Sequence, residues 1–353
     1  SLTFAAATTS MVVLLDGNNP NTMPLFSTTG DFVAALGGVI TVNTAGGTAL
    51  PIGTQYALLS YVGNRPALDL LTFATPNATY SLADPNNNTI WLVVGTPPDE
   101  FWNPHQNATG QLGGNGNWTA TGGVAWSDDA NGTGHHPWVS GGVAHFIDRA
   151  GTVAVGTGAP ILVSGMEFDI GPYSFTGGAL TLTSAGGGPV KINVTDASAT
   201  VTMGVELAQL AAGTQLEKDG PGTLELAAVS SYTGQTSVSA GTLMLSGATM
   251  PLQGAIDVAN VTGAALSVNA TGTMTFGAAN VLTSGGSRAR FNIQAGTVEF
   301  NSQSPGFSGT TTVAGGATLT GTGDLGGTVL VQRNGTLQAP PPGQPVLTAG
   351  GTS

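Results

Sequence analysis

The sequence predicts an all-β chain that folds as a parallel β-helix, in which successive coils stack on one another. Three observations predict this fold. Helical periodicity is nearly absent, short segments with alternating apolar residues run through the chain, and a phrase that begins with glycine returns at a step near 20 residues. Strand periodicity with a fixed step of this length is typical of solenoids, because one repeat cannot bury its apolar side chains without its neighbours.

The composition indicates a folded chain. Only 7% of the 353 residues are charged and 55 are glycine, a combination that also occurs in disordered linkers. The hydrophobic share of 41% and the mean hydropathy of +0.19 argue against disorder, because disordered chains are poor in apolar residues and rich in charge.

The charge and cysteine content restrict the partners and the compartment. The net charge is −12 with only seven Lys and Arg, so a phosphate backbone or an anionic membrane would find little to bind. The absence of cysteine suits a protein that crosses a periplasm unfolded, although a cytosolic protein without cysteine is the alternative. Residues 1–9 show no signal-peptide pattern and no stretch approaches ~20 apolar residues, so an exported chain would be a mature or trimmed piece.

Short strand-like segments follow one another from the N-terminus, each bounded by Gly, Asn, Asp or Pro. The best helical window, residues 204–213, is short, and Pro97 and Pro98 form the clearest breakpoint. We therefore expect a β-rich or β-helical segment over 1–98, an irregular segment rich in Trp, His and Gly over 99–170, and a β-helix over 171–353. The clearest strand-like segments are residues 39–42, 56–61, 89–94, 179–182 and 190–194.

From residue 178 onward one phrase recurs, in which a glycine and a small residue precede alternating apolar residues. The step from Gly222 to Gly241 is 19 residues, and that from Gly296 to Gly316 is 20. At about 20 residues per coil and about 4.8 Å between coils, the whole chain would form roughly 17 coils. The phrase begins at Gly178, Gly222, Gly241, Gly296, Gly316 and Gly335.

A longer repeat relates two parts of this region. Blocks that begin at Gly222 and Tyr232 recur at Gly296 and Phe307, in the same order and with nearly the same spacing between them. We expect Tyr232 and Phe307 to occupy equivalent positions and to pack against a neighbouring coil.

Strand alternation assigns the side chains of both copies to the two faces of the coil. Glu225 and Glu299 are expected to point outward, and the apolar residues on either side of them inward. The inward residues are Leu224, Leu226, Val238 and Leu243, with the counterparts Val298, Phe300, Val313 and Leu319.

One motif runs from Lys218 as Lys-Asp-Gly-Pro-Gly-Thr-Leu-Glu-Leu, continues as Tyr-Thr-Gly-Gln-Thr-Ser-Val and ends as Gly-Thr-Leu. It closely resembles the autotransporter-associated β-strand repeat, also called the passenger-associated transport repeat. Departures occur at Ala227, Ser230 and Ser231, and the second copy has Phe307 for the tyrosine and lacks the lysine. The resemblance implies a right-handed parallel β-helical passenger and efficient secretion, but no ligand and no reaction. The matching positions are Gly222, Thr223, Leu224, Leu226, Tyr232, Gly234, Thr236, Val238, Gly241 and Leu243.

Four of the five tryptophans and all four histidines lie within residues 102–145. One interpretation is a carbohydrate platform, with the tryptophans as candidate glycan contacts. The favoured interpretation is a structural cap, in which large aromatic side chains close the interior column where regular stacking stops. We expect at least three of the four to be mostly buried, and this stretch to be the least regular part of the chain. The four residues are Trp102, Trp118, Trp126 and Trp138.

A metal site in this stretch is not favoured. His135 and His136 are adjacent, and neighbouring residues on a strand point to opposite faces. The acidic loop that begins at Asp129 lacks the distal bidentate Glu of a calcium loop. We therefore expect no metal ligands and no cofactor.

Hydrolytic chemistry has little support either. Glu167 and Asp169 share a strand face by their spacing, and Asp99 adjoins Glu100, so carboxylate pairs of the kind used in glycoside hydrolysis exist. The chain offers almost no Lys or Arg to line a polysaccharide groove, and no Gly-x-Ser-x-Gly nucleophile turn. We expect no catalytic residues and no enzymatic activity.

These observations favour a secreted passenger rod with a structural, adhesive or self-associating role, outside or on the surface of a Gram-negative bacterium. Its partners would be a host or neighbouring-cell surface, matrix, or like chains joined end to end; neither nucleic acid nor membrane insertion is expected. One alternative is a subunit of an extracellular filament or surface layer, because an uncovered coil end can template stacking. A glycan-binding or glycan-cleaving β-helix is less favoured.

Overall fold

The computed structural model divides the chain into two compact units, one up to Pro98 and one that begins at Asp99. It describes residues 2–4, 10–15, 25–27, 32–34, 38–44, 50, 54–62, 71–73, 80–83, 89–107, 109–184, 188–340 and 347–351. No helix occurs among these residues, so none of the described chain forms a helix able to span a membrane. The all-β prediction is confirmed, and the window at 204–213 contains a strand.

The first unit is β-rich but is not a stack of regular coils. β1 (Leu2–Phe4) pairs with β4 (Phe32–Ala34), and β2 (Ser10–Leu15), β5 (Gly38–Thr44) and β7 (Leu71–Phe73) form a parallel sheet. β9 (Thr89–Val94) runs antiparallel to β6 (Gln55–Ser60) and to β8 (Tyr80–Ala83), while β3 (Phe26–Ser27) flanks β6. Buried side chains of these strands, Leu58 and Leu92 among them, form a core of their own.

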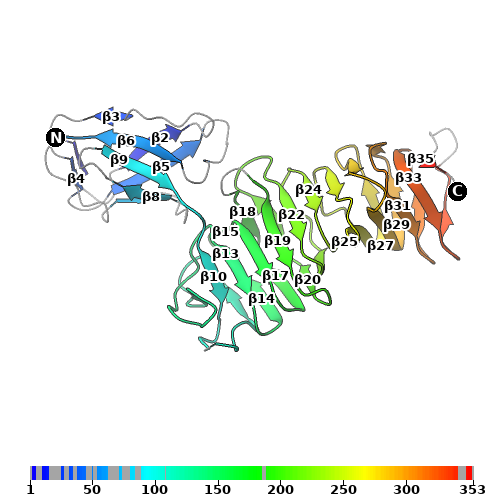
Figure 1. Cartoon of the computed structure of the whole chain (residues 1–353), viewed down its shortest axis with the longest axis horizontal. Coiled ribbons are helices and arrows are strands. Elements are labelled where there is room, and N and C mark those ends of the chain that lie inside the picture. The colour runs from blue at the N-terminus through cyan, green and yellow to red at the C-terminus, as the bar shows by residue number, and fades with distance from the viewer. Residues whose placement is uncertain are drawn as a thin grey trace. The chain divides into compact units, whose positions relative to one another are not determined.

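The second unit is a parallel β-solenoid of about nine turns, and Figure 1 shows its strands following one another in chain order. One wall contains β12 (Trp126–Ser127), β10 (Asp99–Trp102), β13 (Val143–Phe146), β16 (Gly165–Phe168), β19 (Val190–Val194), β22 (Leu216–Asp219), β24 (Thr236–Val238), β26 (Ile256–Val258) and β28 (Leu282–Ser284). All its neighbours pair in parallel except β10 and β12.

A second wall contains β11 (Gly116–Trp118), β14 (Gly151–Val155), β17 (Tyr173–Gly177), β20 (Thr200–Met203), β23 (Thr223–Leu226), β25 (Thr242–Gly247), β27 (Ala265–Phe276), β29 (Arg290–Phe300), β31 (Thr310–Val313), β33 (Asp324–Val331) and β30 (Gln303–Ser304). β32 (Thr318–Thr320), β34 (Thr336–Leu337) and β35 (Thr348–Gly351) extend it. A short third wall contains β15 (Ile161–Val163), β18 (Leu180–Leu182) and β21 (Leu207–Gln209).

The expected number of roughly 17 coils is wrong, for two physical reasons. The described strands of the first unit include antiparallel pairs and do not follow one another as regular coils. In the second unit the step is not uniform: Leu216 pairs with Thr236 after an ordinary coil, but Ile256 pairs with Leu282 after a longer one. Most of the extra residues lie in β27, which has 12 residues with register shifts in its pairing to β29, whereas β23 in the ordinary coil has four.

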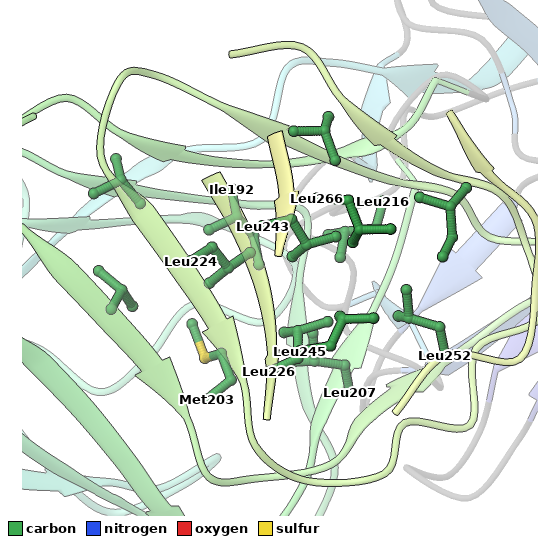
Figure 2. Close-up of a cluster of buried hydrophobic side chains, with 14 of the residues drawn as sticks. Ile192, Met203, Leu207, Leu216, Leu224, Leu226, Leu243, Leu245, Leu252 and Leu266 are labelled. Atoms are coloured by element: carbon green, nitrogen blue, oxygen red, sulfur yellow. The ribbon is translucent and has the colours of Figure 1, made fainter. Parts of the chain in front are cut away.

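The interior consists of apolar columns that run from coil to coil. Leu224 pairs with Leu243 and then with Leu266, while Leu226 and Leu245 form the adjacent column (Figure 2). Every residue predicted to point inward in the two repeat copies has an exposed fraction of 0%, so the predicted register is confirmed. The carboxylates of Glu225 and Glu299 instead accept hydrogen bonds from threonines on the outer face.

Candidate functional site

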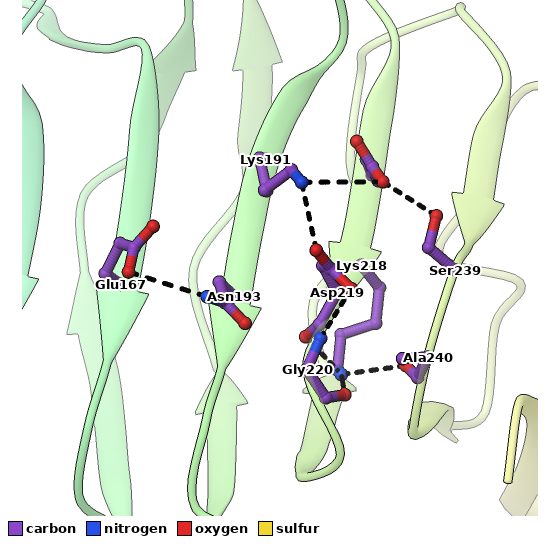
Figure 3. Close-up of polar contacts among 9 residues, drawn as sticks. Glu167, Lys191, Asn193, Lys218, Asp219, Gly220, Ser239 and Ala240 are labelled. Carbon is purple, nitrogen blue, oxygen red and sulfur yellow. Dashed lines mark hydrogen bonds and ion pairs between the residues drawn. The ribbon is translucent and has the colours of Figure 1, made fainter.

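The repeat region contains a buried lysine that joins two coils. Leu216 and Lys218 alternate inward on β22, and Lys218 has an exposed fraction of 0%. Its Nζ donates hydrogen bonds to the backbone carbonyls of Asp219 and Gly220, both at 2.7 Å, and of Ala240 at 3.1 Å (Figure 3). An ammonium has three protons, and here each has one carbonyl acceptor. Because Ala240 lies on the following coil, this contact, which we call the lysine clip, ties consecutive corners together.

The ammonium group of Lys218 keeps its charge at neutral pH. Burial lowers the pKa of Lys218 to about 8, and the nearby Asp219 carboxylate limits that decrease. The Asp219 side chain points outward instead, where its Oδ2 accepts a hydrogen bond from Lys191 at 2.9 Å. Lys191, Lys218 and Asp219 therefore form two separate contacts, one on the outer face and one inside the corner. The sequence analysis placed Lys218 at the start of the repeat motif but did not predict the clip.

Two further repeat residues fix the two ends of β24: Tyr232 precedes the strand, and Gly241 follows it at the corner of the lysine clip. Tyr232 is fully buried, and its hydroxyl oxygen lies 2.7 Å from Oγ1 of Thr236, the residue that begins β24. Phe307 in the second copy is equally buried, so the prediction that both rings pack inside is confirmed. Gly241 has φ of +62°, a conformation that residues with a Cβ rarely adopt.

We expect Gly241→Ala to destabilise the solenoid more than Gly213→Ala. Both glycines have positive φ, which costs about 1–2 kcal/mol for an L-residue. A Cβ on Gly241 would also lie 2.4 Å from two backbone carbonyl oxygens, of Gly220 and Gly222, whereas Gly213 has open space. Urea unfolding of the two variants measures the difference, and equal losses would show that the close approach at Gly241 is unimportant.

The four tryptophans form one buried cluster at the first coil, which we call the tryptophan cap. Their exposed fractions are 0% for Trp102 and Trp118, 1% for Trp126 and 5% for Trp138. Trp118 and Trp126 lie 4.8 Å apart between ring centroids, and Trp138 lies 4.8 Å from Trp118 and 4.6 Å from Trp126. The predicted burial is confirmed, and these ring faces contact other side chains, not solvent.

The irregular backbone of this stretch explains the cluster. Glu100 on β10 pairs with Ala144 on β13, and the chain between them is about twice as long as an ordinary coil. Within that step β12 returns antiparallel to β10 and places Trp126 opposite Trp102. The indole nitrogen of Trp102 donates to the Gly114 carbonyl at 2.9 Å, and that of Trp138 to the Leu162 carbonyl at 3.1 Å. The inserted chain therefore closes the end of the apolar columns.

Comparison with known proteins agrees with this geometry. Residues 216–245, which extend from the start of β22 into β25, match the model of the passenger-associated transport repeat. These residues therefore contain a repeat of the kind found in autotransporter passengers, as the motif predicts. It is also 26% identical over 366 residues to the adhesin BmaC autotransporter of Brucella suis, an alignment that covers 89% of this chain and 10% of that protein. No solved structure matches the chain.

The match assigns a location to this passenger segment. The repeat and the relative together place it outside the cell or at the surface of a Gram-negative bacterium, as the sequence predicts. The segment spans about a tenth of the length of the curated relative that it matches.

Three carboxylates that the sequence offered as catalytic or metal-binding candidates are engaged in local contacts. Oε2 of Glu167 accepts a hydrogen bond from Asn193 at 3.5 Å, and Oδ1 of Asp169 accepts one from Thr195 at 3.0 Å. Asp129 accepts hydrogen bonds from the backbone of Asn131 and Thr133, which lowers its pKa. Among the described residues no group of three or more His, Asp or Glu side chains has the arrangement of a metal site.

Proposed function

We propose that this passenger segment is a structural rod within a surface adhesin, which presents binding surfaces to a host or neighbouring cell and performs no catalysis. The observation that carries the proposal is the set of apolar columns along the solenoid, in which the repeat residues are used for packing and for joining coils. A solenoid built in this way holds outward side chains at fixed spacing over a long distance. The adhesin BmaC relative supports an adhesive role.

A non-enzymatic role fits the distribution of charge. The chain has seven Lys and Arg, and Lys191 and Lys218 are already engaged by carboxylates or carbonyls. The carboxylates of Glu225 and Glu299 bond to threonines on neighbouring coils. Hydrolysis of a glycan uses two carboxyl groups that flank the scissile bond. Glu167 and Asp169, the pair that share a strand face by their spacing, instead accept hydrogen bonds from Asn193 and Thr195.

Bead attachment tests the adhesive role. Beads coated with the purified chain are expected to attach to cultured host cells more often than beads coated with the same chain unfolded by heat. Soluble folded chain should compete for attachment, because both present the same outer face. Equal attachment of folded and unfolded chain would contradict the proposal.

Removal of one whole coil should leave the rod folded. Leu216 pairs with Thr236 and Thr236 with Ile256, so deletion of residues 236–255 removes one complete coil and brings Leu216 into register with Ile256. We expect cooperative unfolding to be kept, with a rod shorter by about 4.8 Å. Deletion of residues 236–245 is the matched control and should abolish cooperative unfolding, because it leaves half a coil. Bead attachment by the one-coil variant then locates the binding surface inside or outside that coil.

Self-association is a second candidate function, supported by the last described coils. Val331 and Leu337 pair with the buried Val313 and Leu319, yet their exposed fractions are 38% and 56%. A coil stacked on these side chains would cover them, and in the filament alternative that coil belongs to a like chain. Sedimentation of the wild-type chain and of Leu337→Asp tests this: a concentration-dependent mass that the substitution abolishes is expected for end-to-end association, and a monomer at all concentrations would contradict it.

A further inference from the structure

The inward face of the first coil contains a carboxyl group where the next three coils have apolar residues. Glu100 and Trp102 alternate inward on β10, and Glu100 has an exposed fraction of 2%. Glu100 pairs with Ala144, Ala144 with Met166 and Met166 with Ile192 in the same row. Oε2 of Glu100 makes no hydrogen bond, so this carboxyl is buried without a full set of partners.

One imidazole lies between Glu100 and a second carboxylate. Nε2 of His136 is 3.4 Å from Oε2 of Glu100 and 3.1 Å from Oδ1 of Asp128. Nδ1 of His136 is 2.7 Å from the carbonyl oxygen of Pro137, which only accepts, so Nδ1 carries a proton. If His136 is neutral, Nε2 therefore presents a lone pair to two carboxyl groups. The arrangement needs one more proton, either on Nε2 or on Glu100.

The third charged group near Glu100 is the carboxylate of Asp99, which lies on the outer face of the coil. Asp99, the preceding residue, faces His145 of β13, with its Oδ1 3.0 Å from Nε2. Lys218, the other ionised residue of the inward row, lies on β22, four strands further along the wall, and is engaged by the lysine clip. Glu100 is therefore opposed by His136 alone and repelled by Asp99 and Asp128.

The imidazole is attached to the tryptophan cap through the backbone. The N–H of Trp126 donates to the His136 carbonyl at 3.2 Å, and the N–H of His136 donates to the Trp126 carbonyl at 3.0 Å. Residues 126–138, which we call the flap, thus contain two of the cap tryptophans and the partner of Glu100. Any change that separates His136 from Glu100 moves the segment that carries Trp126 and Trp138.

We propose that the flap is a pH-sensitive closure of the solenoid end, held shut while a proton lies between Glu100 and His136 and loosened when that proton leaves. Ionised Glu100 without this proton is a buried charge, and opening of the flap admits water to it. The closed state therefore binds one proton more tightly than the open state.

The direction of the pH dependence follows from burial. Desolvation raises the pKa of Glu100 from 4.5 to about 7; His136 opposes the rise, while Asp128 and Asp99 add to it. A raised pKa in the closed state means that the stabilisation is complete below about pH 4.5 and is lost as pH rises to about 7. We expect the opening constant of the flap to rise about tenfold per pH unit between pH 5 and 7 and then to level off.

Hydrogen exchange and tryptophan fluorescence of the full chain test the closure. Exchange of residues 126–138, corrected for the intrinsic pH dependence, should speed up between pH 5 and 7, and the tryptophan emission should shift to longer wavelength over the same range. Glu100→Gln is expected to remove both changes, because an amide keeps no titrating proton. A wild-type flap that exchanges equally at pH 5 and 8, or an unchanged slope in Glu100→Gln, would overturn the proposal.

Asp128→Asn gives a second measurement that does not depend on Glu100→Gln folding. The Asp128 carboxylate raises the pKa of Glu100, so its neutralisation should shift the levelling-off point to lower pH. Asp128 is mostly exposed, with 69% of its side chain accessible, and its replacement should leave the fold intact. A levelling-off point that stays near pH 7 in Asp128→Asn would show that these groups are not coupled.

Discussion

Trp118→Ala is expected to lower the free energy of unfolding by about 3–5 kcal/mol, as is usual for deletion of a fully buried large aromatic side chain. Trp118 has an exposed fraction of 0% and contacts Trp126, Trp138 and Phe146. Its removal would leave a cavity at the centre of the cap, which several rigid rings surround and cannot easily fill. Urea unfolding measures the loss.

The same variant separates packing from sugar binding. Trp118→Phe keeps an aromatic ring and should recover part of the lost stability. On a glycan array, we expect the wild-type chain to bind no glycan. Any glycan that it does bind should be bound equally by Trp118→Ala. Loss of glycan binding with an unchanged melting temperature would contradict the packing role and support a carbohydrate platform.

Lys218→Met should lower the free energy of unfolding by about 2–4 kcal/mol, because three buried carbonyls lose charge-assisted hydrogen bonds that the thioether cannot replace. Lys191→Met is the matched control. Lys191 also contacts Asp219, but its side chain is 46% exposed, so its ion pair should contribute no more than about 1 kcal/mol.

Denaturant unfolding gives the loss in free energy of unfolding for each of these two variants. The difference between the two losses therefore measures the contribution of the lysine clip to stability. Similar losses in both variants would show that Lys218 acts only through the charge of Asp219. Hydrogen exchange at Ala240 and its neighbours should increase in Lys218→Met alone, because Lys218 bonds to the Ala240 carbonyl and Lys191 bonds to Asp219 and Glu217 instead.

The strand register of the repeat region was predictable from the sequence, because the glycines and the alternating apolar residues define it. Gly222 and Gly241 mark the corners, and Leu224 and Leu226 alternate with outward residues, so the inward columns follow from period two alone. The number of coils was not predictable from the same reasoning. The ordinary coil that ends at Thr236 and the longer one that ends at Leu282 both pair in parallel, but the longer one contains the 12-residue strand β27 with its shifts of register, which period two does not predict.

The two buried ionisable groups were missed, although the alternation contains a signal for both. Lys218 lies two residues after the inward Leu216, and Glu100 lies two residues before the inward Trp102. Read strictly, period two places both side chains inside. The residue types indicated the opposite, because Lys and Glu are almost never fully buried unless they are paired. The partner of Lys218 lies on another coil and the partner of Glu100 lies after a reversal of the chain, so neither pair was visible in the sequence.

The antiparallel return of β12 had no sequence signal that distinguished it from a further coil. Its pairing with β10 covers only two residues, Phe101 with Ser127 and Trp102 with Trp126. A strand pairing that covers so few residues and joins distant parts of the sequence depends on how the indole rings pack. Local periodicity does not describe that packing.

The unequal coil lengths have a mechanical consequence. Hydrogen bonds between coils are directed along the solenoid axis, so tension along that axis loads one coil junction at a time. Release of the coil between Leu216 and Thr236 frees about 70 Å of chain, and release of the longer coil between Ile256 and Leu282 about 90 Å. Each released coil was only about 4.8 Å thick. Under shear a segment of this kind lengthens in a series of unequal increments and dissipates force at each one, while the coils that remain stacked keep their shape.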